Sequence, residues 1–477
     1  MLGKNQELLM GDGSQIGEPP QRKTLSMRFI SAYTTFFQRF FPSPFVIAVI
    51  LSAVVFCAAW FFGSADLSFG ETSLAWYNGI WNSGGMVFLV QMMLMLVLGH
   101  VLALSAPVER LLNQLLLFAN SSAKAIWLVC LISLITCWIN WGLGLIVSAV
   151  LARKVGEAFS RDKKPLNYAL LGAVAYSGMM FWHGGLSGSA PLKVAEEGHL
   201  QGLLSGSGLT ELPMTVPVTE TLFTTTNVVG SILVLLFVPV IMVWVQGLFP
   251  ESVPDVQSGE DQQGEEAQLS GLEQLDSSSW FAKTLGGVIV CVAVYQMAVS
   301  GKAMGAINPN WINTMLLGLA MVCHQHLTSF LRATGTAVQG AVGILLQFPL
   351  YFGIMGLMKD SGLVGQIADF FVYHSTQSTF PIFTFISAGV VNLFVPSGGG
   401  QWLVQGPIVV QACSDFGIPI SKGVMALAYG DQLTNMLQPF WALPLLGITG
   451  LKAKEILPFT LMLFVLGGLI YLGLLLV

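Results

Sequence analysis

The sequence predicts an all-α polytopic membrane protein, with about nine transmembrane helices and two oppositely oriented re-entrant hairpins in an inverted repeat. The composition, the spacing of apolar runs and two interrupted apolar runs predict this fold. Of 477 residues, 54% are hydrophobic and only 9% are charged, whereas soluble domains carry about 25% charged residues. A net charge of −5 offers no basic surface for nucleic acid. A chain embedded in the lipid bilayer, with no nucleic-acid partner, is therefore expected.

Apolar runs predict the membrane crossings. Residues 1–27 form a polar N-terminal tail, and the first long apolar run starts near Pro44, too late for a cleaved signal peptide. A bilayer core roughly 30 Å thick takes about 20 helical residues. The runs predicted to cross it are 44–62, 86–104, 167–191, 223–249, 283–299, 311–327, 337–358, 423–446 and 456–477. Amphipathic segments 28–41, 106–119 and 361–373 are predicted to lie at the interface.

Two more apolar segments, 126–151 and 380–416, are interrupted in the middle. The first break is the run Asn140 to Gly144, and the second extends from Asn392 to Gly400. Non-helical backbone is tolerated at membrane depth only where it is buried in protein or lines a watery cavity. Each segment is therefore predicted to be a pair of half-helices whose break forms the wall of a site.

Basic residues predict the orientation of the chain. With both hairpins re-entrant, sixteen of the 20 lysines and arginines fall on one side, and the other side holds Lys193, Lys302, Lys359 and Lys422. Cytoplasmic loops are enriched in lysine and arginine. The N-terminus is therefore expected in the cytoplasm and the C-terminus in the periplasm, with the hairpins opening to opposite sides.

Matching motifs predict an inverted repeat. Asn140 and Asn392 are 392 − 140 = 252 residues apart, and Tyr176 and Tyr429 are 429 − 176 = 253 apart. The repeats would cover 28–249 and 300–477. Between them lie an acidic cytoplasmic linker, 250–282, and a connecting transmembrane helix, 283–299, which inverts the second repeat.

The hairpin breaks are the candidate binding residues. The N-terminus of a half-helix presents unpaired N–H groups and a partial positive charge. Ser397, Gly398, Gly399 and Gly400 are thus predicted to bind a carboxylate, together with Trp141, Gly142 and Gly144 of the first break. Close helix packing is the alternative role for these glycines.

Asp431 is an ionisable residue inside a predicted crossing, where charge is costly and usually functional. It could bind a cation or carry a proton, or it could lie in water at a helix end. Asn140 and Asn392 could offer amide oxygens to the same cation, with helix capping as the alternative. The polar residues predicted to complete the substrate surface are Tyr176, Tyr429, Gln432 and Asn435.

A polar stretch at 182–189 interrupts the predicted crossing 167–191. His183, Ser187 and Ser189 could therefore face a transport pathway. Gly185 to Gly188 also fits the Gly-x-Ser-Gly pattern in which an intramembrane protease seats a serine nucleophile, which would be Ser187. The repeat architecture argues against that enzyme, and no catalytic residue is expected.

Several motifs resemble the bacterial short-chain fatty acid transporter family from about Phe36 to the C-terminus. They are NWGLGL (140–145), NLFVPSGGGQW (392–402), QGP (405–407), AYGDQ (428–432) and QPFWALP (438–444). The resemblance implies uptake of small monocarboxylates across the bacterial inner membrane, coupled to a cation gradient. It also implies an elevator-type carrier, often a homodimer, in which Asn140, Asn392 and Ser397–Gly400 belong to the substrate and cation region.

These inferences together predict a secondary active transporter of short-chain carboxylates such as butyrate or acetoacetate. It would use H⁺ or Na⁺ as coupling ion and need no other cofactor. The hairpins with 167–191 and 423–446 would move against a scaffold of the remaining spans. No lysine or arginine lies deep in the predicted core, which favours a singly charged substrate. A cation/proton antiporter that exchanges through Asp431 is the alternative.

Overall fold

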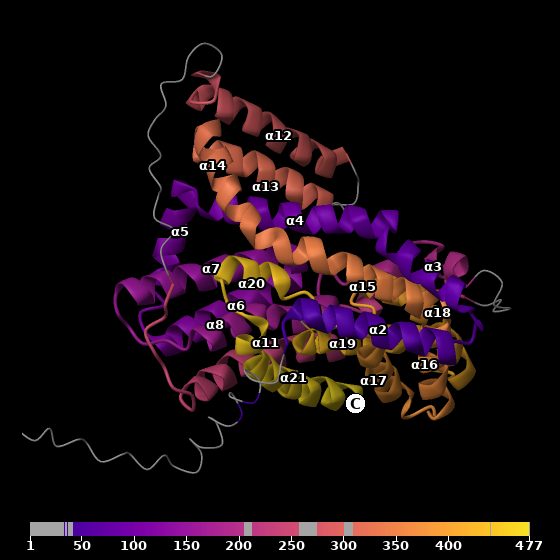
Figure 1. Cartoon of the computed structure of the whole chain (residues 1–477). Helices are drawn as coiled ribbons and strands as arrows, with labels where there is room; N and C mark the ends of the chain where they lie inside the picture. Colours follow the sequence, from indigo (N-terminus) through magenta and orange to yellow (C-terminus); the bar gives the residue numbers. More distant parts are fainter. Residues whose placement is uncertain are drawn as a thin grey trace, which may run out of the picture.

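The computed structural model describes residues 33, 36, 42–204, 212–256, 274–299, 309–438 and 440–476. Within these residues the regular structure is helical, and one isolated bridge joins Leu166 to Ser252. The predicted all-α fold is therefore confirmed (Figure 1). The polar tail 1–27, nearly all of segment 28–41 and much of linker 250–282 lie outside the described residues.

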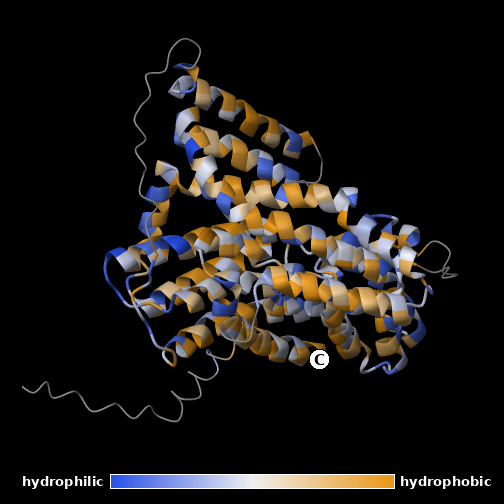
Figure 2. Ribbon diagram, viewed as in Figure 1, coloured by the Kyte–Doolittle hydropathy of each residue, from blue (hydrophilic) through white to orange (hydrophobic). Residues whose placement is uncertain are grey.

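Seven helical stretches in the described part are long and apolar enough to cross a membrane. Figure 2 shows hydrophobic residues along these helices and hydrophilic residues mainly near their ends. The stretches are Pro44–Phe62, Phe69–Ala103, Ser122–Ile139, Thr225–Gln246, Ser279–Val299, Leu327–Asp360 and Ala453–Leu475.

One group of helices, called the outer group, packs around residues 83–103 and 342–360. In this outer group, small residues let backbones approach closely, as is usual in membranes. A methyl group on Gly79 would come within 2.6 Å of the Phe352 carbonyl oxygen, and one on Gly286 within 2.7 Å of the Gly318 carbonyl oxygen. The outer group comprises α2 (Pro44–Phe62), α3 (Phe69–Ile80), α4 (Ser83–Ala103), α5 (Ala106–Leu116), α12 (Ser279–Val299), α13 (Pro309–His324), α14 (Leu327–Ala337), η5 (Val338–Ala341) and α15 (Val342–Asp360).

A second group holds both hairpins. It contains α6 (Ser122–Ile139), α7 (Trp141–Arg161), α8 (Tyr168–Tyr176), α11 (Thr225–Gln246), α16 (Leu363–Tyr373), α17 (Phe380–Asn392), α18 (Gly398–Phe416), α19 (Ile420–Thr434) and α21 (Ala453–Leu475). Helix α11 packs on α6 and α21, and α21 also packs on α8. Spans 223–249 and 456–477, which were predicted to belong to the scaffold, thus pack next to hairpin helix α6 and broken helix α8.

Two predicted crossings, 167–191 and 423–446, are not continuous helices. Helix α8 ends at Tyr176 and gives way to η1 (Ser177–Met180) and η2 (Trp182–Gly184). Ser133 of α6 causes this break, because its hydroxyl donates to the Ala175 carbonyl (2.7 Å) and accepts the Gly178 N–H (3.0 Å). Short helices α9 (Ser189–Lys193), α10 (His199–Leu203) and η3 (Val218–Glu220) follow before α11.

Helix α19 likewise ends at Thr434 and continues as η6 (Asn435–Leu437), with α20 (Leu443–Thr449) beyond it. Residue 439 is a proline, which has no N–H to donate to the Asn435 carbonyl. That carbonyl instead accepts the Tyr176 hydroxyl at 3.1 Å. The broken ends of α8 and α19 are therefore joined to each other.

Both hairpin breaks are shorter than predicted. Asn140 is the single residue between α6 and α7, so Gly142 and Gly144 are already helical. The second break covers 393–397, and Gly398 begins α18. In each case a polar residue with extended backbone restarts the helix, since it caps the new N-terminus with its own side chain.

Candidate functional site

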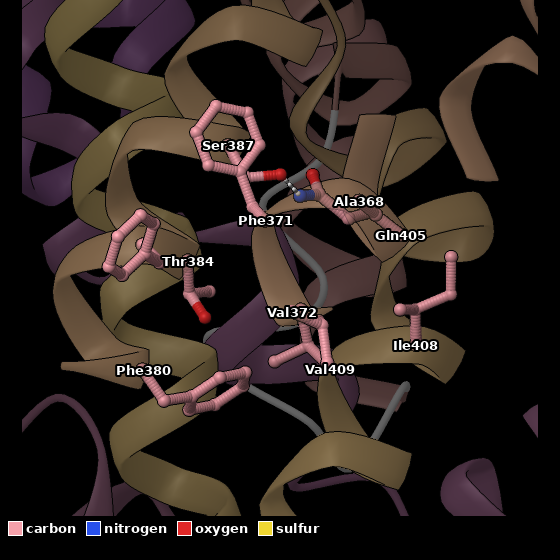
Figure 3. Close-up of a pocket in the computed structure, with 10 residues that line it drawn as sticks. Ala368, Phe371, Val372, Phe380, Thr384, Ser387, Gln405, Ile408 and Val409 are labelled. Carbon is pink, nitrogen blue, oxygen red and sulfur yellow. Dashed lines mark hydrogen bonds between the residues drawn. The ribbon is translucent and has the colours of Figure 1, made fainter. Parts of the chain in front are cut away.

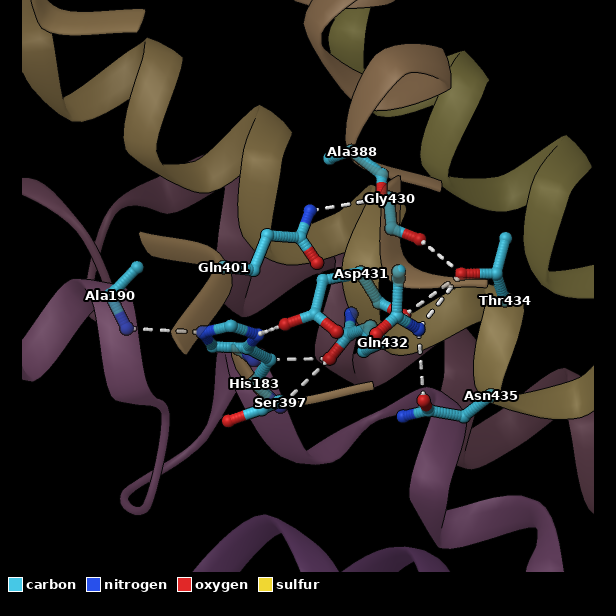
Figure 4. Close-up of polar contacts among 12 residues, drawn as sticks. His183, Ala190, Ala388, Ser397, Gln401, Gly430, Asp431, Gln432, Thr434 and Asn435 are labelled. Carbon is cyan, nitrogen blue, oxygen red and sulfur yellow. Dashed lines mark hydrogen bonds and ion pairs between the residues drawn. The ribbon is translucent and has the colours of Figure 1, made fainter. Parts of the chain in front are cut away.

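The second hairpin and the two broken helices meet at a buried polar cluster centred on His183 and Asp431 (Figure 4). His183 comes from η2 and Asp431 from α19. A methyl group on Gly398, the first residue of α18, would come within 2.8 Å of Asp431 Oδ2 and 2.9 Å of His183 Cε1. Residues more than 200 positions apart in the sequence thus form one site.

His183 and Asp431 form a close buried pair. Nδ1 of His183 lies 2.6 Å from Oδ2 of Asp431, and the two side chains are 0% and 2% exposed. Nε2 accepts the backbone N–H of Ala190 at 3.1 Å, so that nitrogen carries no proton. The ring proton is then on Nδ1, since a neutral imidazole protonates one nitrogen only. Nδ1 and Asp431 Oδ2 are in close contact, but both are buried without a hydrogen-bond partner among the described residues.

Amide side chains hold the His183 segment in place. Gln432 Oε1 accepts the N–H groups of His183 (2.9 Å) and Gly184 (3.1 Å). Asn227 Nδ2 donates to the Gly184 carbonyl at 2.9 Å, and Tyr429 donates its hydroxyl to Asn227 Oδ1 at 2.9 Å. These bonds substitute for helical ones in η2, so the imidazole is held rigidly against α19.

Asn392, the last residue of α17, ties the hairpin to the broken end of α19. Its Nδ2 lies within donating distance of the Asp431 carbonyl (2.8 Å), Thr434 Oγ1 (3.0 Å) and Asn435 Oδ1 (3.1 Å). Asn435 Nδ2 donates in turn to the Met179 carbonyl in η1 at 3.0 Å. Asn392 and Asn435 therefore fix the hairpin, α19 and η1 relative to one another.

The N-terminus of α18 faces this cluster. Ser397 Oγ accepts the Gly400 N–H at 3.2 Å, which caps the helix. Nearby, Trp182 Nε1 and Gln432 Nε2 are buried donors without a partner, and Gln401 Oε1 and Asn392 Oδ1 are buried acceptors without a partner. Unpaired buried polar groups are expensive. Unpaired groups of this kind are expected at a site where a polar ligand supplies the missing hydrogen bonds.

A chain of amides runs from the cluster toward a small cavity between α16, α17 and α18 (Figure 3). Gln401 Nε2 donates to Gln405 Oε1 (2.9 Å), and Gln405 Nε2 donates to Ser387 Oγ (2.9 Å). The cavity has a volume of about 10 Å³, room for about one water. Gln405 and Ser387 belong to its lining, so water can approach the cluster from this side.

The tip of the first hairpin reaches the cluster only indirectly. Asn140 Oδ1 accepts the Leu143 N–H at 3.0 Å, so Asn140 is a helix cap, the alternative left open above. Gly144 lies against the Cys137 backbone, where a methyl group would come within 2.4 Å, and Gly142 faces Met95. The Trp141 ring packs on Trp182 and Trp441, with centroids 6.0 and 4.8 Å away.

Ser187 anchors that tip. Its Oγ accepts the backbone N–H of Trp141 at 3.0 Å. His183 uses Nε2 for Ala190 and places Nδ1 against Asp431, so it is not available to Ser187 as a base. The protease interpretation is therefore wrong. Ser189, in the same segment, begins α9 next to Gly399.

The hydroxyls of both predicted tyrosines are bonded within the protein. Tyr176 and Tyr429 are 1% and 2% exposed, and each donates its hydroxyl to an asparagine. Sequence reasoning missed Asn227, Trp182 and Gln401 as members of the cluster. An asparagine beside an apolar run is a usable signal for Asn227. The sequence offers no such signal for Trp182 and Gln401, because tryptophan and glutamine are also common where helices simply pack together.

Comparisons with known proteins identify the family to which the chain belongs. The family model described as short chain fatty acid transporter matches residues 25–477. A relative from Escherichia coli (strain K12), provisionally named a short-chain fatty acid transporter, is 35% identical over 450 residues, covering 92% of this chain and 96% of the relative. A relative from Haemophilus influenzae with the same name is 35% identical over 433 residues, covering 89% and 94%. A solved structure, the Alcanivorax borkumensis YdaH transporter, has a TM-score of 0.44 and 15% identity, covering 91% of this chain and 99% of that one. The chain therefore belongs to the short-chain fatty acid transporter family, and it is a multi-pass membrane transporter rather than an enzyme.

Proposed function

We propose that this protein is a secondary active transporter that takes up short-chain monocarboxylates such as butyrate or acetoacetate. The carboxylate would bind at the N-terminus of α18, against the N–H groups at Gly398 and Gly399. The observation that carries this proposal is the buried N-terminus of α18 beside unpaired donors on Trp182 and Gln432. A helix N-terminus attracts anions, and those donors would complete the carboxylate shell.

The same site favours a substrate with one charge and a short tail. Among the described residues, the buried polar side chains include no lysine or arginine, so a second carboxylate would find no counter-charge. The rings of Trp141, Trp182 and Trp441 lie beside one another near the α18 N-terminus. They would form the apolar wall for the tail.

We further propose an elevator mechanism in an inverted repeat. The moving part would be the second helix group, including α11 and α21, and the outer group would be the scaffold and the surface of a homodimer. The helix caps support pairing Asn140 with Ser397, 397 − 140 = 257 residues apart, instead of Asn140 with Asn392. The inner membrane location, cytoplasmic N-terminus and periplasmic C-terminus belong to the same proposal.

Uptake of labelled butyrate into proteoliposomes tests the transport proposal. We expect saturable uptake that unlabelled acetoacetate inhibits and succinate does not, with and without H⁺ and Na⁺ gradients. A buried acid beside a histidine also suits a cation/proton antiporter. Absence of butyrate uptake, together with Na⁺-dependent proton release from the vesicles, would favour that second function.

A further inference from the structure

We infer that Asp431, positioned by His183, is the site of the coupling proton, and that one proton enters with each monocarboxylate. This inference rests on the proposed function and names its coupling ion. It starts from the 2.6 Å contact between His183 Nδ1 and Asp431 Oδ2, with both side chains buried. Both atoms are buried without a hydrogen-bond partner in the part of the chain that the structure describes, and a buried carboxylate beside a histidine inside a membrane protein is typical of a proton relay.

The bound substrate would require a second proton. With one proton on His183 Nδ1, the pair carries a net charge of −1. The N-terminus of α18 touches this pair, because a methyl group on Gly398 would come within 2.8 Å of Asp431 Oδ2. A substrate carboxylate there would lie beside the Asp431 carboxylate in a buried place, where like charges disfavour joint ionisation. One added proton removes this repulsion.

The structure offers that proton a place on Asp431. His183 Nε2 is not free to take it, since it accepts the Ala190 N–H at 3.1 Å. Gln401 lies three residues after Gly398 on α18, hence on the helix face that meets Asp431. Its Oε1 is buried without a partner, and Figure 4 shows the Gln401 amide beside Asp431. A protonated Asp431 has an O–H to donate to that oxygen.

The proton balance of one cycle follows. The empty, outward-facing site takes one carboxylate from outside at the α18 N-terminus and one proton at the Asp431 carboxylate. The loaded site therefore has the same net charge as the empty site. Both leave on the inside, where the proton returns to water and Asp431 is again a carboxylate beside His183. Transport is therefore electroneutral.

Other titratable groups on the surrounding helices are engaged elsewhere. The hydroxyls of Tyr176, Tyr429 and Tyr471 donate to Asn435, Asn227 and Met180. His199 Nε2 accepts the Trp402 indole N–H at 2.9 Å. The remaining titratable residues of α6, α9, α18 and α19 are Lys124, Cys130, Cys137, Lys193, Cys413, Asp415 and Lys422. In the described part of the chain, Asp431 and His183 are thus the buried titratable pair that touches the α18 N-terminus.

The experiment measures uptake of labelled acetoacetate by the full chain in proteoliposomes, after subtraction of uptake by protein-free vesicles. Counterflow without any gradient reports transport itself. Initial uptake under an inward proton gradient, with a pH dye inside, reports coupling. For the native chain we expect gradient-driven uptake with one proton per acetoacetate, no response to a Na⁺ gradient and none to membrane potential.

Two variants and one control sharpen the result. Asp431→Asn should lose gradient-driven uptake by at least about tenfold, since it removes the coupling site. His183→Gln should lower the proton-to-acetoacetate ratio, which a purely structural role of His183 would not change. His374→Gln, on an exposed residue after α16, should behave like the native chain.

The outcomes separate the two proposals. Normal counterflow with net uptake that brings in no proton, or with uptake driven by Na⁺, would overturn the proton site and leave the transport function standing. Absence of counterflow in the native chain would overturn the transport function itself. A proton-to-acetoacetate ratio unchanged in His183→Gln would remove that residue from coupling.

Discussion

The two hairpins restart their second helices in the same way but present them to different surroundings. At the first tip, one residue, Asn140, ends α6 and caps α7, and the neighbouring side chains are Trp182 and Trp441 besides Ser187. At the second tip, residues 393–397 separate the arms, and the new helix begins with Gly398 against His183 and Asp431. A helix N-terminus becomes a binding site only where small residues and buried polar partners surround it. We therefore regard the first tip as structural and the second as the site.

A glycine-to-alanine pair gives the largest expected contrast between the tips. In Gly398→Ala, the methyl group would come within 2.9 Å of both His183 Cε1 and the Trp182 ring, besides Asp431. Overpacking of this kind costs about 1–3 kcal/mol, and each 1.4 kcal/mol is about tenfold in affinity. We expect at least about tenfold weaker butyrate transport from this change, measured as uptake per reconstituted protein.

Gly142→Ala is the matched change at the first tip. Its methyl group would meet the end of the Met95 side chain at 2.8 Å, and a flexible methionine can move aside. We expect transport within about threefold of the native chain, since displaced Met95 costs under about 1 kcal/mol. An equal, large loss in both variants with unchanged Tm would contradict the division between a structural and a binding tip.

Asn392→Ala tests how strongly the second tip depends on its amide. The change leaves the Asp431 carbonyl, Thr434 Oγ1 and Asn435 Oδ1 without the donor that Asn392 supplies. Buried groups left unpaired cost about 1–3 kcal/mol. We expect a lower Tm in detergent and severalfold slower butyrate uptake. Normal uptake and Tm would show that Asn392 does not hold the site together.

The sequence predicted the helical membrane fold and the second tip well, because both follow from local patterns. Long apolar runs identify spans, and Ser397 caps the helix that restarts at Gly398. Asp431 was recognisable because a carboxylate inside an apolar run is rare. Its partner His183 could not be assigned from spacing, since the two residues meet only after α8 and α19 both break.

The errors share one physical cause. Crossing 423–446 was expected to be continuous, because its hydropathy is continuous. Crossing 167–191 was expected to be interrupted at 182–189, whereas α8 already ends at Tyr176. They break because distant groups replace helical hydrogen bonds, such as the Ser133 hydroxyl at Ala175 and Gly178. Asn140 was expected to pair with Asn392, because both residues are asparagines. In the structure, Asn140 and Ser397 are the residues that cap the second arm of each hairpin.

Ser187→Ala should have a moderate effect at the first tip. The Ser187 hydroxyl accepts the Trp141 N–H at 3.0 Å, and the variant leaves that donor half-buried without its partner. Loss of one such bond costs about 1 kcal/mol. We expect a small fall in Tm and about two- to threefold slower uptake, as Trp141 shifts against Trp182. Complete inactivation with an unchanged Tm would assign Ser187 a direct role in transport.

Asn140→Ser should have the smallest effect and is the most direct test of the cap. Serine and asparagine are nearly equal at an N-cap, whereas alanine costs about 1 kcal/mol there. If Asn140 only caps α7, Asn140→Ser should keep both Tm and butyrate uptake, and Asn140→Ala should lower Tm. If a cation instead binds the Asn140 amide oxygen, Asn140→Ser should also lose uptake, because the shorter serine side chain cannot place its oxygen in the same position. Loss of uptake in Asn140→Ser with a native Tm would therefore show that the first tip also binds substrate or cation. The two hairpins would then not differ in function.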